Sequence, residues 1–274
     1  MLYTQEQISN FSEQSFAYLI VEEKENVLTI TLNRPEKRNA FHMPLANELA
    51  YALAYAHYTN AVWCVVLKAN GPTFCAGADL KAFAGDDTVE KPSTIPLPKD
   101  LVKLGEEFNG LHKPCIAQVH GDVYAGGFLM ICGATHVVTV ENAKFGLPEV
   151  KRGIWPMQVM ASLEPLMNAR QLLDLCIRAK TLTAFEAKEI GIVTDIVREE
   201  DLADEVQKLI EDIKEQSPTA IRLGLKAFQE MKSKAAEDKH KFLHAMLMQV
   251  LQSKDAAEGL AAFKEKRKAV WTGN

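Results

Sequence analysis

The sequence lacks the features that would place a protein in a membrane or on nucleic acid. The chain has 274 residues and contains no uninterrupted apolar run of the roughly 20 residues that a membrane-spanning helix needs. Its N-terminus has no basic region followed by an apolar one, the pattern of a secretory signal. The formal net charge of -5 gives no electrostatic reason to expect a nucleic acid or a membrane surface as partner. We therefore expect neither partner.

Cysteine is also scarce, and its spacing does not suggest disulfides. The five cysteines, Cys64, Cys75, Cys115, Cys132 and Cys176, are widely spaced, odd in number and never form a C-x-x-C motif. Most of them stand in apolar runs, which is typical of buried thiols in a reducing compartment. The sequence therefore predicts a cytoplasmic location.

The usual motifs for nucleotides and metals are missing as well. Neither GxxxxGK[ST] nor GxGxxG occurs. His240 and His244 have the i, i+4 spacing of metal ligands on a helix, but HEXXH is absent and no acidic third ligand is obvious. We expect no metal and no cofactor other than one that arrives with a substrate.

Strands that alternate with helices occupy the first part of the chain. Residues 62–69 (VWCVVLKA) and 115–120 (CIAQVH) are apolar on both faces, which favours buried parallel strands. Before the first of these two segments, Leu45, Leu49 and Leu53 recur at the spacing of a helix face. This alternation predicts an α/β fold with mostly parallel sheets.

The pattern changes near residue 199, after which four helical segments follow with no strand between them. We therefore predict a core domain over residues 1–198 and a helical region over residues 199–274. Residues 1–17 are polar at their start and are interpreted as a loose N-terminal arm or an extra helix.

Two segments combine the end of a buried strand, a glycine-containing turn and the start of a helix: residues 75–80 (CAGADL) and 124–129 (YAGGFL). Small residues let a ligand approach the backbone closely, and the first N–H groups of a helix have no internal partner. Two such groups on one oxygen would form an oxyanion hole. Tight packing is the commoner reason for such turns, and that alternative stays open. Asp79 is expected to cap the first helix rather than to act in catalysis.

A third segment, residues 144–156, carries a candidate proton-transfer group. Glu149 directly follows Pro148 and has Leu147 and Val150 as neighbours. Burial among apolar residues raises the pKa of a carboxylate and makes it a better proton shuttle near neutral pH. A solvated loop glutamate is the alternative.

Six motifs together resemble those of the crotonase superfamily, the enoyl-CoA hydratases and isomerases, from about residue 20 to the C-terminus. They are 33–41 (NRPEKRNAF), 74–83 (FCAGADLKAF), 119–127 (VHGDVYAGG), 145–154 (FGLPEVKRGI), 182–193 (LTAFEAKEIGIV) and 259–268 (GLAAFKEKRK). The resemblance implies a crotonase-like spiral of repeated ββα units, followed by a C-terminal helical trimerisation region. It also implies an acyl-CoA thioester as substrate and a homotrimer or hexamer as assembly.

The same resemblance implies site residues. The N–H groups of Ala78 and Gly126 correspond to the family's oxyanion hole. Ala76 and Leu80 correspond to positions beside the adenine of CoA.

Further positions correspond to the rest of the CoA site. Lys37, Arg38 and Ala40 belong to the segment that runs along the pantetheine and phosphates of CoA. Phe263 and Lys266 correspond to positions on the C-terminal helix that complete the nucleotide site, sometimes from a neighbouring subunit.

One departure from the family pattern bears on the reaction. Hydratases of the family resemble one another in having two catalytic glutamates, and this chain has Leu129 at the first position and Glu149 at the second. Adding water needs a group that activates the water and a second that orients it, whereas moving a double bond needs one base. The family's enoyl-CoA isomerases are similar to this chain at both positions.

We therefore predict a Δ3-Δ2 enoyl-CoA isomerase of fatty-acid metabolism, with Glu149 as the single base and Leu129 in the substrate pocket. The alternatives are an atypical enoyl-CoA hydratase of fatty-acid or amino-acid degradation, other enolate chemistry, and a catalytically silent acyl-CoA-binding protein.

Overall fold

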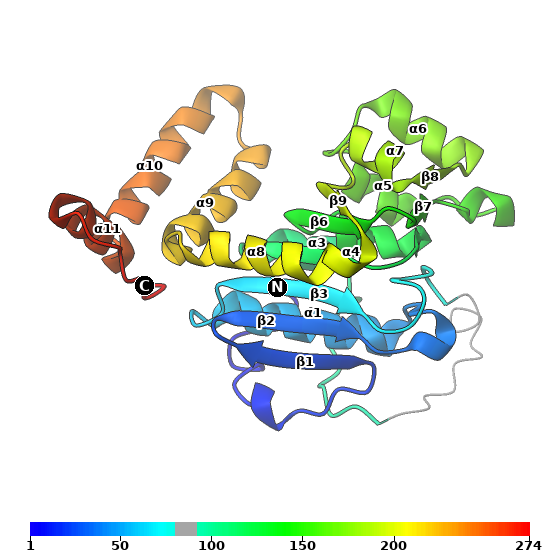
Figure 1. Cartoon of the computed structure of the whole chain (residues 1–274), viewed down its shortest axis with the longest axis horizontal. Coiled ribbons are helices and arrows are strands. Elements are labelled where there is room, and N and C mark those ends of the chain that lie inside the picture. The colour runs from blue at the N-terminus through cyan, green and yellow to red at the C-terminus, as the bar shows by residue number, and fades with distance from the viewer. Residues whose placement is uncertain (80–91) are drawn as a thin grey trace.

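A computed structural model describes residues 1–79 and 92–274 (Figure 1). Its main sheet has six strands in the order β1-β2-β3-β4-β6-β9. The first pair is an antiparallel hairpin, and every later neighbour is parallel. The prediction of a mostly parallel sheet is confirmed. The strands are β1 (Leu19–Lys24), β2 (Val27–Leu32), β3 (Cys64–Ala69), β4 (Cys115–Val119), β6 (His136–Val140) and β9 (Asp195–Val197).

A second sheet of three short strands lies beside the first. It consists of β5 (Val123–Tyr124), β7 (Lys144–Gly146) and β8 (Thr181–Thr183), in the order β5-β7-β8. β7 is parallel to β5 and antiparallel to β8. Because β5 and β7 end side by side, the segments that follow them start from the same edge.

The helices of the core cover these sheets. α1 (Met43–Tyr58) contains the three leucines that recur at helical spacing, and all three are fully buried. α3 (Leu104–Gly110) packs Leu104 and Phe108 into the core, while Leu101 before it stays exposed. The other helices of the core are α4 (Phe128–Ile131), α5 (Met157–Leu163), α6 (Ala169–Arg178) and α7 (Ala184–Glu189).

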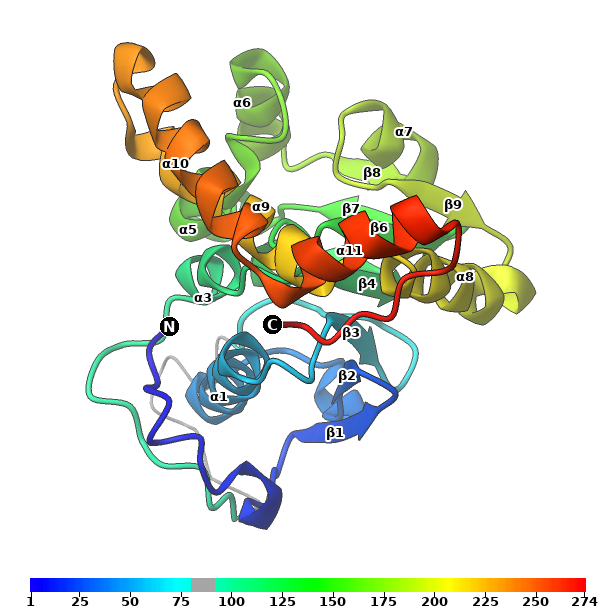
Figure 2. The same ribbon diagram turned by 90° about the vertical axis from the view of Figure 1, so that its left-hand side faces the viewer.

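Four helices fill the C-terminal region, as predicted: α8 (Leu202–Lys214), α9 (Pro218–Glu230), α10 (Lys239–Leu251) and α11 (Lys254–Glu265). α8 contacts β3, β4 and β6 and so covers part of the main sheet. The other three stand together at one end of the molecule (Figures 1 and 2). The proposed boundary at residues 198 and 199 thus precedes a helix that is packed on the core sheet.

The N-terminal segment is packed, not loose, and it forms no α-helix. Tyr3 and Ile8 are buried in a small second core against α1. The ring of Phe11 stacks on that of Tyr55, with ring centroids 3.7 Å apart. Widely spaced aromatic side chains anchor the segment here, although its sequence has no periodic apolar pattern.

All five cysteines are free thiols, and four of them are buried, as the sequence predicts. In the part of the chain that the structure describes, no helix combines the length and apolar character needed to cross a bilayer.

Candidate active site

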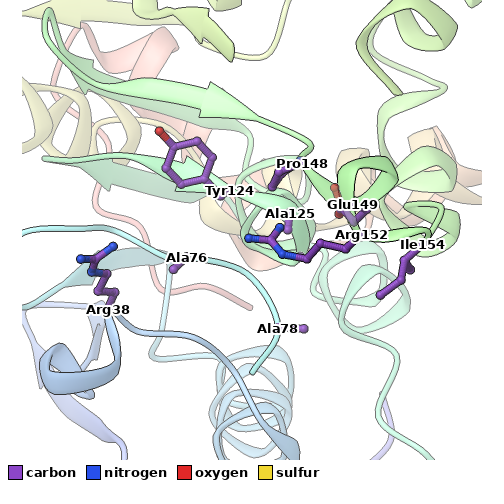
Figure 3. A pocket seen from close by; sticks show the side chains of 10 residues that line it. Arg38, Ala76, Ala78, Tyr124, Ala125, Pro148, Glu149, Arg152 and Ile154 are labelled. Carbon is purple, nitrogen blue, oxygen red and sulfur yellow. The ribbon is translucent and has the colours of Figure 1, made fainter. Parts of the chain in front are cut away.

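A cavity of about 630 Å³ opens where the two glycine-containing loops meet the segment after β7 (Figure 3). That volume falls within the range of small-molecule sites, roughly 300–1,000 Å³. Its walls come from four segments that are far apart in the sequence. The lining residues are Arg38, Ala76, Ala78, Tyr124, Ala125, Gly126, Pro148, Glu149, Arg152 and Ile154.

Backbone hydrogen bonds to Phe41 hold the first loop in an extended conformation around Ala78. Phe41 and Ala78 form a parallel bridge, in which the Phe41 N–H donates to the Gly77 carbonyl (2.9 Å). The Asp79 N–H donates in turn to the Phe41 carbonyl (2.8 Å). Since these bonds flank Ala78, its own N–H points away from the segment of Phe41. Ala78 lines the cavity.

The second loop follows β5 and tightens into the 3₁₀ helix η3 (Ala125–Gly127), which leads into α4. Gly126 is the second residue of this turn, so its N–H has no partner inside the helix. Ala125 has φ of 50°, the left-handed region that is unfavourable for a residue with a side chain. Backbone strain of this kind is common at functional sites.

Two glycines allow the loops to touch. A side chain at Gly77, where φ is 93°, would lie 2.5 Å from the Ala125 Cβ and 3.2 Å from the Gly126 nitrogen. A side chain at Gly126 would collide with the ring of Phe41. The N–H groups of Ala78 and Gly126 therefore come from adjoining loops on one cavity, as an oxyanion hole requires.

Glu149 is the first residue of the 3₁₀ helix η4 (Glu149–Arg152), with Pro148 before it. Its Oε2 atom is buried and has no hydrogen-bond partner within the described residues. Burial raises the pKa of this carboxyl above its ordinary value, and Arg152 opposes the rise to a smaller extent. A carboxylate of this kind can accept a proton from a bound substrate near neutral pH.

Leu129 does not line the cavity as predicted. It lies in α4, with 8% of its surface exposed, and packs in the main core. Among the residues that the structure describes, Glu149 is the one carboxylate on the cavity wall.

The predicted CoA residues near the first loop are only partly brought together. Arg38 and Ala76 line the cavity, whereas Lys37 and Ala40 do not. The carbonyl of Ala40 instead accepts a hydrogen bond from Arg34 (2.8 Å). Leu80 lies outside the described residues.

Asp79 has a partner that the sequence did not suggest. Its carboxylate forms an ion pair with the buried Arg34 guanidinium at 2.8 Å. The helix that it was expected to cap lies outside the described part of the chain. The ion pair ties the first loop to the segment after β2.

Phe263 and Lys266 are far from the cavity within one chain. They belong to the end of α11, which lies at the opposite end of the molecule from the cavity loops (Figure 1). Phe263 is 85% exposed. A single chain therefore leaves these two residues out of the site.

Two polar residues of the cavity were not predicted. Tyr124 donates its hydroxyl hydrogen to Asp122 Oδ2 (3.1 Å), and its pKa is raised by burial and by that carboxylate. Arg152 follows Glu149 by three residues, one turn of a 3₁₀ helix. A spacing of three residues places Arg152 beside Glu149 only if the segment forms a 3₁₀ helix, which the sequence does not reveal.

Comparisons with known proteins agree along nearly the whole chain. The family model described as "Enoyl-CoA hydratase/isomerase" matches residues 22–274. An enoyl-CoA hydratase of Mycobacterium tuberculosis is 31% identical over 256 residues, which cover 90% of this chain and 94% of that protein. The carnitinyl-CoA dehydratase of Escherichia coli is 31% identical over 254 residues, covering 90% of this chain and 95% of that protein.

Solved structures are similar in fold over the same length. The crystal structure of an enoyl-CoA hydratase from Mycobacterium tuberculosis has a TM-score of 0.82 at 28% identity, and the match covers 94% of this chain and 99% of that one. A probable enoyl-CoA hydratase/isomerase from Mycobacterium abscessus has a TM-score of 0.81 at 30% identity, with the same coverage.

Proposed function

Because the chain belongs to the enoyl-CoA hydratase/isomerase family and acts on acyl-CoA thioesters as that family does, we propose that it is a Δ3-Δ2 enoyl-CoA isomerase. The observation that carries the proposal is that, among the described residues, Glu149 alone places a carboxylate on the cavity wall, with Leu129 packed in the core. One carboxylate is sufficient to move a double bond, because a single proton is removed and returned.

The reaction follows from the site. The thioester oxygen of a 3-enoyl-CoA accepts hydrogen bonds from the N–H groups of Ala78 and Gly126. These bonds strengthen as negative charge develops on that oxygen, so they stabilise the enolate more than the substrate. Glu149 removes a proton from C2, the double bond shifts from C3 to C2, and the same proton is returned to C4. The raised pKa of Glu149 suits both proton transfers.

The second candidate is an enoyl-CoA hydratase, and the printed names of the curated relatives favour it. Hydration would need another group to orient the attacking water. The Tyr124 hydroxyl is committed to Asp122 and is directed away from Glu149 (Figure 3). The described residues therefore support the isomerase better.

The proposed reaction moves only a proton, so it requires no metal and no redox cofactor, and CoA enters as part of the substrate. We place the enzyme in the cytoplasm. The five unpaired cysteines support this location, since secreted proteins usually oxidise theirs.

The test is to mix the protein separately with a 3-enoyl-CoA and a 2-enoyl-CoA and follow the absorbance of the conjugated enoyl thioester. The isomerase raises the absorbance with the 3-enoyl substrate and lowers it little with the 2-enoyl one. A rapid fall with the 2-enoyl substrate, without conversion of the other, would establish the hydratase instead. Glu149→Gln removes the base, and Glu164→Gln changes an exposed glutamate outside the cavity as its control.

A further inference from the structure

Two arginines face the same cavity from different segments. Arg38 is the left-handed residue that ends the 3₁₀ helix η2 (Pro35–Lys37), beside the first loop. Arg152 is the last residue of η4, which begins with Glu149. Side chains three residues apart in a 3₁₀ helix project from the same side. Arg152 therefore enters the cavity from the wall that carries the base.

Both guanidinium groups are free of direct polar contacts with other protein groups in the part of the chain that the structure describes. Within the described residues, neither Arg38 nor Arg152 takes part in an ion pair or a side-chain hydrogen bond. Arg152 acts on the adjacent Glu149 carboxylate through its charge, which lowers the pKa of that carboxyl, while Glu149 Oε2 has no hydrogen-bond partner among the described residues. Figure 3 shows the Arg152 side chain extended past Ala125, away from Glu149 and toward the side of Arg38.

Two cations facing one cavity repel each other unless an anion lies between them. A guanidinium offers a planar fork of donors that matches a carboxylate or a phosphate in bidentate geometry. We propose that Arg152, together with Arg38, binds an anionic group of the substrate, and that Arg152 is thereby a specificity residue of the cavity. The proposal rests on the acyl-CoA function argued above.

An acyl-CoA can present such an anion in two ways: as a phosphate of its CoA part, or as a carboxylate at the far end of its acyl group. The chemistry at the arginines is the same in both cases. The two sources differ in which ligands should respond to loss of Arg152, so binding measurements can separate them.

The experiment is isothermal titration calorimetry of Arg152→Gln with three probes. Butyryl-CoA has the phosphates and a neutral acyl group, glutaryl-CoA adds an acyl carboxylate, and S-butyryl-pantetheine has neither anion. Lys151→Gln is the matched control, because Lys151 is the exposed neighbour that does not line the cavity. We expect a ten-fold or larger rise in Kd for the probes that carry the recognised anion, from the loss of a charged hydrogen bond. Arg152→Lys should restore part of the affinity.

Each outcome is decisive. Equal weakening of both CoA esters, with S-butyryl-pantetheine unchanged, assigns the anion to a CoA phosphate. Weakening of glutaryl-CoA beyond butyryl-CoA assigns it to the acyl carboxylate. An unchanged Kd for all three probes overturns the arginine site alone. Weakening of S-butyryl-pantetheine as large as that of the CoA esters also overturns it, because it marks a structural effect of the substitution. A wild-type protein that binds no CoA ester overturns the proposed function and the arginine site together.

Discussion

At the scale of single residues, Glu149 sets activity against stability. Its burial raises its pKa in the folded chain, so ionisation costs stability as the pH rises through that raised value. Glu149→Gln removes this cost, and at pH 7 we expect a melting temperature a few degrees above that of the wild type, measured by calorimetry. The difference should vanish as the pH falls well below the ordinary glutamate pKa of about 4.3, where Glu149 is protonated in both the folded and the unfolded chain. Turnover should fall at least about 100-fold. A lower melting temperature at pH 7 would contradict the argument.

The pH dependence of turnover tests the coupling between Arg152 and Glu149. The base acts in its ionised form, so activity should be lost on the acid side at a pH above the ordinary glutamate value of about 4.3. Arg152 lowers the pKa of Glu149, opposing the effect of burial. Arg152→Gln should therefore shift the acid limb of kcat/KM to still higher pH, whereas Lys151→Gln should leave it in place. A shift to lower pH would show that the two groups are not coupled in this direction.

Of the residues predicted from sequence motifs, Ala76, Ala78, Gly126 and Glu149 line one cavity. Tyr124 and Arg152 were missed, because neither residue type is distinctive alone and their positions depend on short turns. Leu129 was misplaced for a related reason: a helix of one turn does not reveal from its sequence which side faces the ligand.

At the scale of elements, the contact between the two loops depends on glycine. At Gly126, a methyl group would collide with the Phe41 ring and push the loops apart. We expect Gly126→Ala to reduce turnover by roughly 100-fold through the displaced N–H group, and to destabilise the fold by about 1–3 kcal/mol. Gly224→Ala is the control, since nothing lies near its new methyl group in α9. That change should stabilise the protein slightly. Equal activity in both variants would show that the Gly126 N–H group does not stabilise the enolate.

The buried carboxylate of Glu48 fastens the N-terminal segment to α1. Its two oxygens accept hydrogen bonds from the backbone N–H groups of Ala17 (2.7 Å) and Tyr18 (2.9 Å). Glu48→Ala leaves both donors without their partner, at a cost of about 1–3 kcal/mol. Urea unfolding should show this loss, together with faster proteolysis near residue 17. Glu22→Ala, at an exposed position of β1, should change neither.

Elements with a local apolar pattern could be predicted from the sequence, whereas a segment that packs through isolated side chains could not. α1, β3 and β4 have runs or repeats of apolar residues that form a continuous buried face, and the sequence located them from that pattern. The N-terminal segment packs through separate anchors, such as Tyr3 and Phe11, which contact residues far along the chain. No local pattern contains that information, so its polar composition was misleading.

At the scale of the whole molecule, the C-terminal helices leave an apolar surface uncovered. Large exposed apolar side chains recur from α9 to the C-terminal tail: Phe228, Leu243, Leu247, Met248, Leu251, Leu260, Phe263 and Val270. α9, α10 and α11, which carry all of them except Val270, stand at one end of the molecule (Figure 1). Surfaces of this kind commonly mark contacts between proteins. With the family resemblance, this predicts that the chain assembles through α9–α11 into a homotrimer or hexamer.

Size-exclusion chromatography coupled to light scattering tests this assembly, with an expected mass of three or six chains. Leu260→Glu places a charge on the apolar surface and should lower that mass. Leu101→Glu is the matched control, since both leucines are 66% exposed and Leu101 lies outside the C-terminal helices. If a neighbouring chain brings Phe263 and Lys266 to the cavity, the affinity of Leu260→Glu for CoA esters should fall together with its mass. A fall in mass with unchanged affinity would mean that the cavity of one chain holds CoA without them.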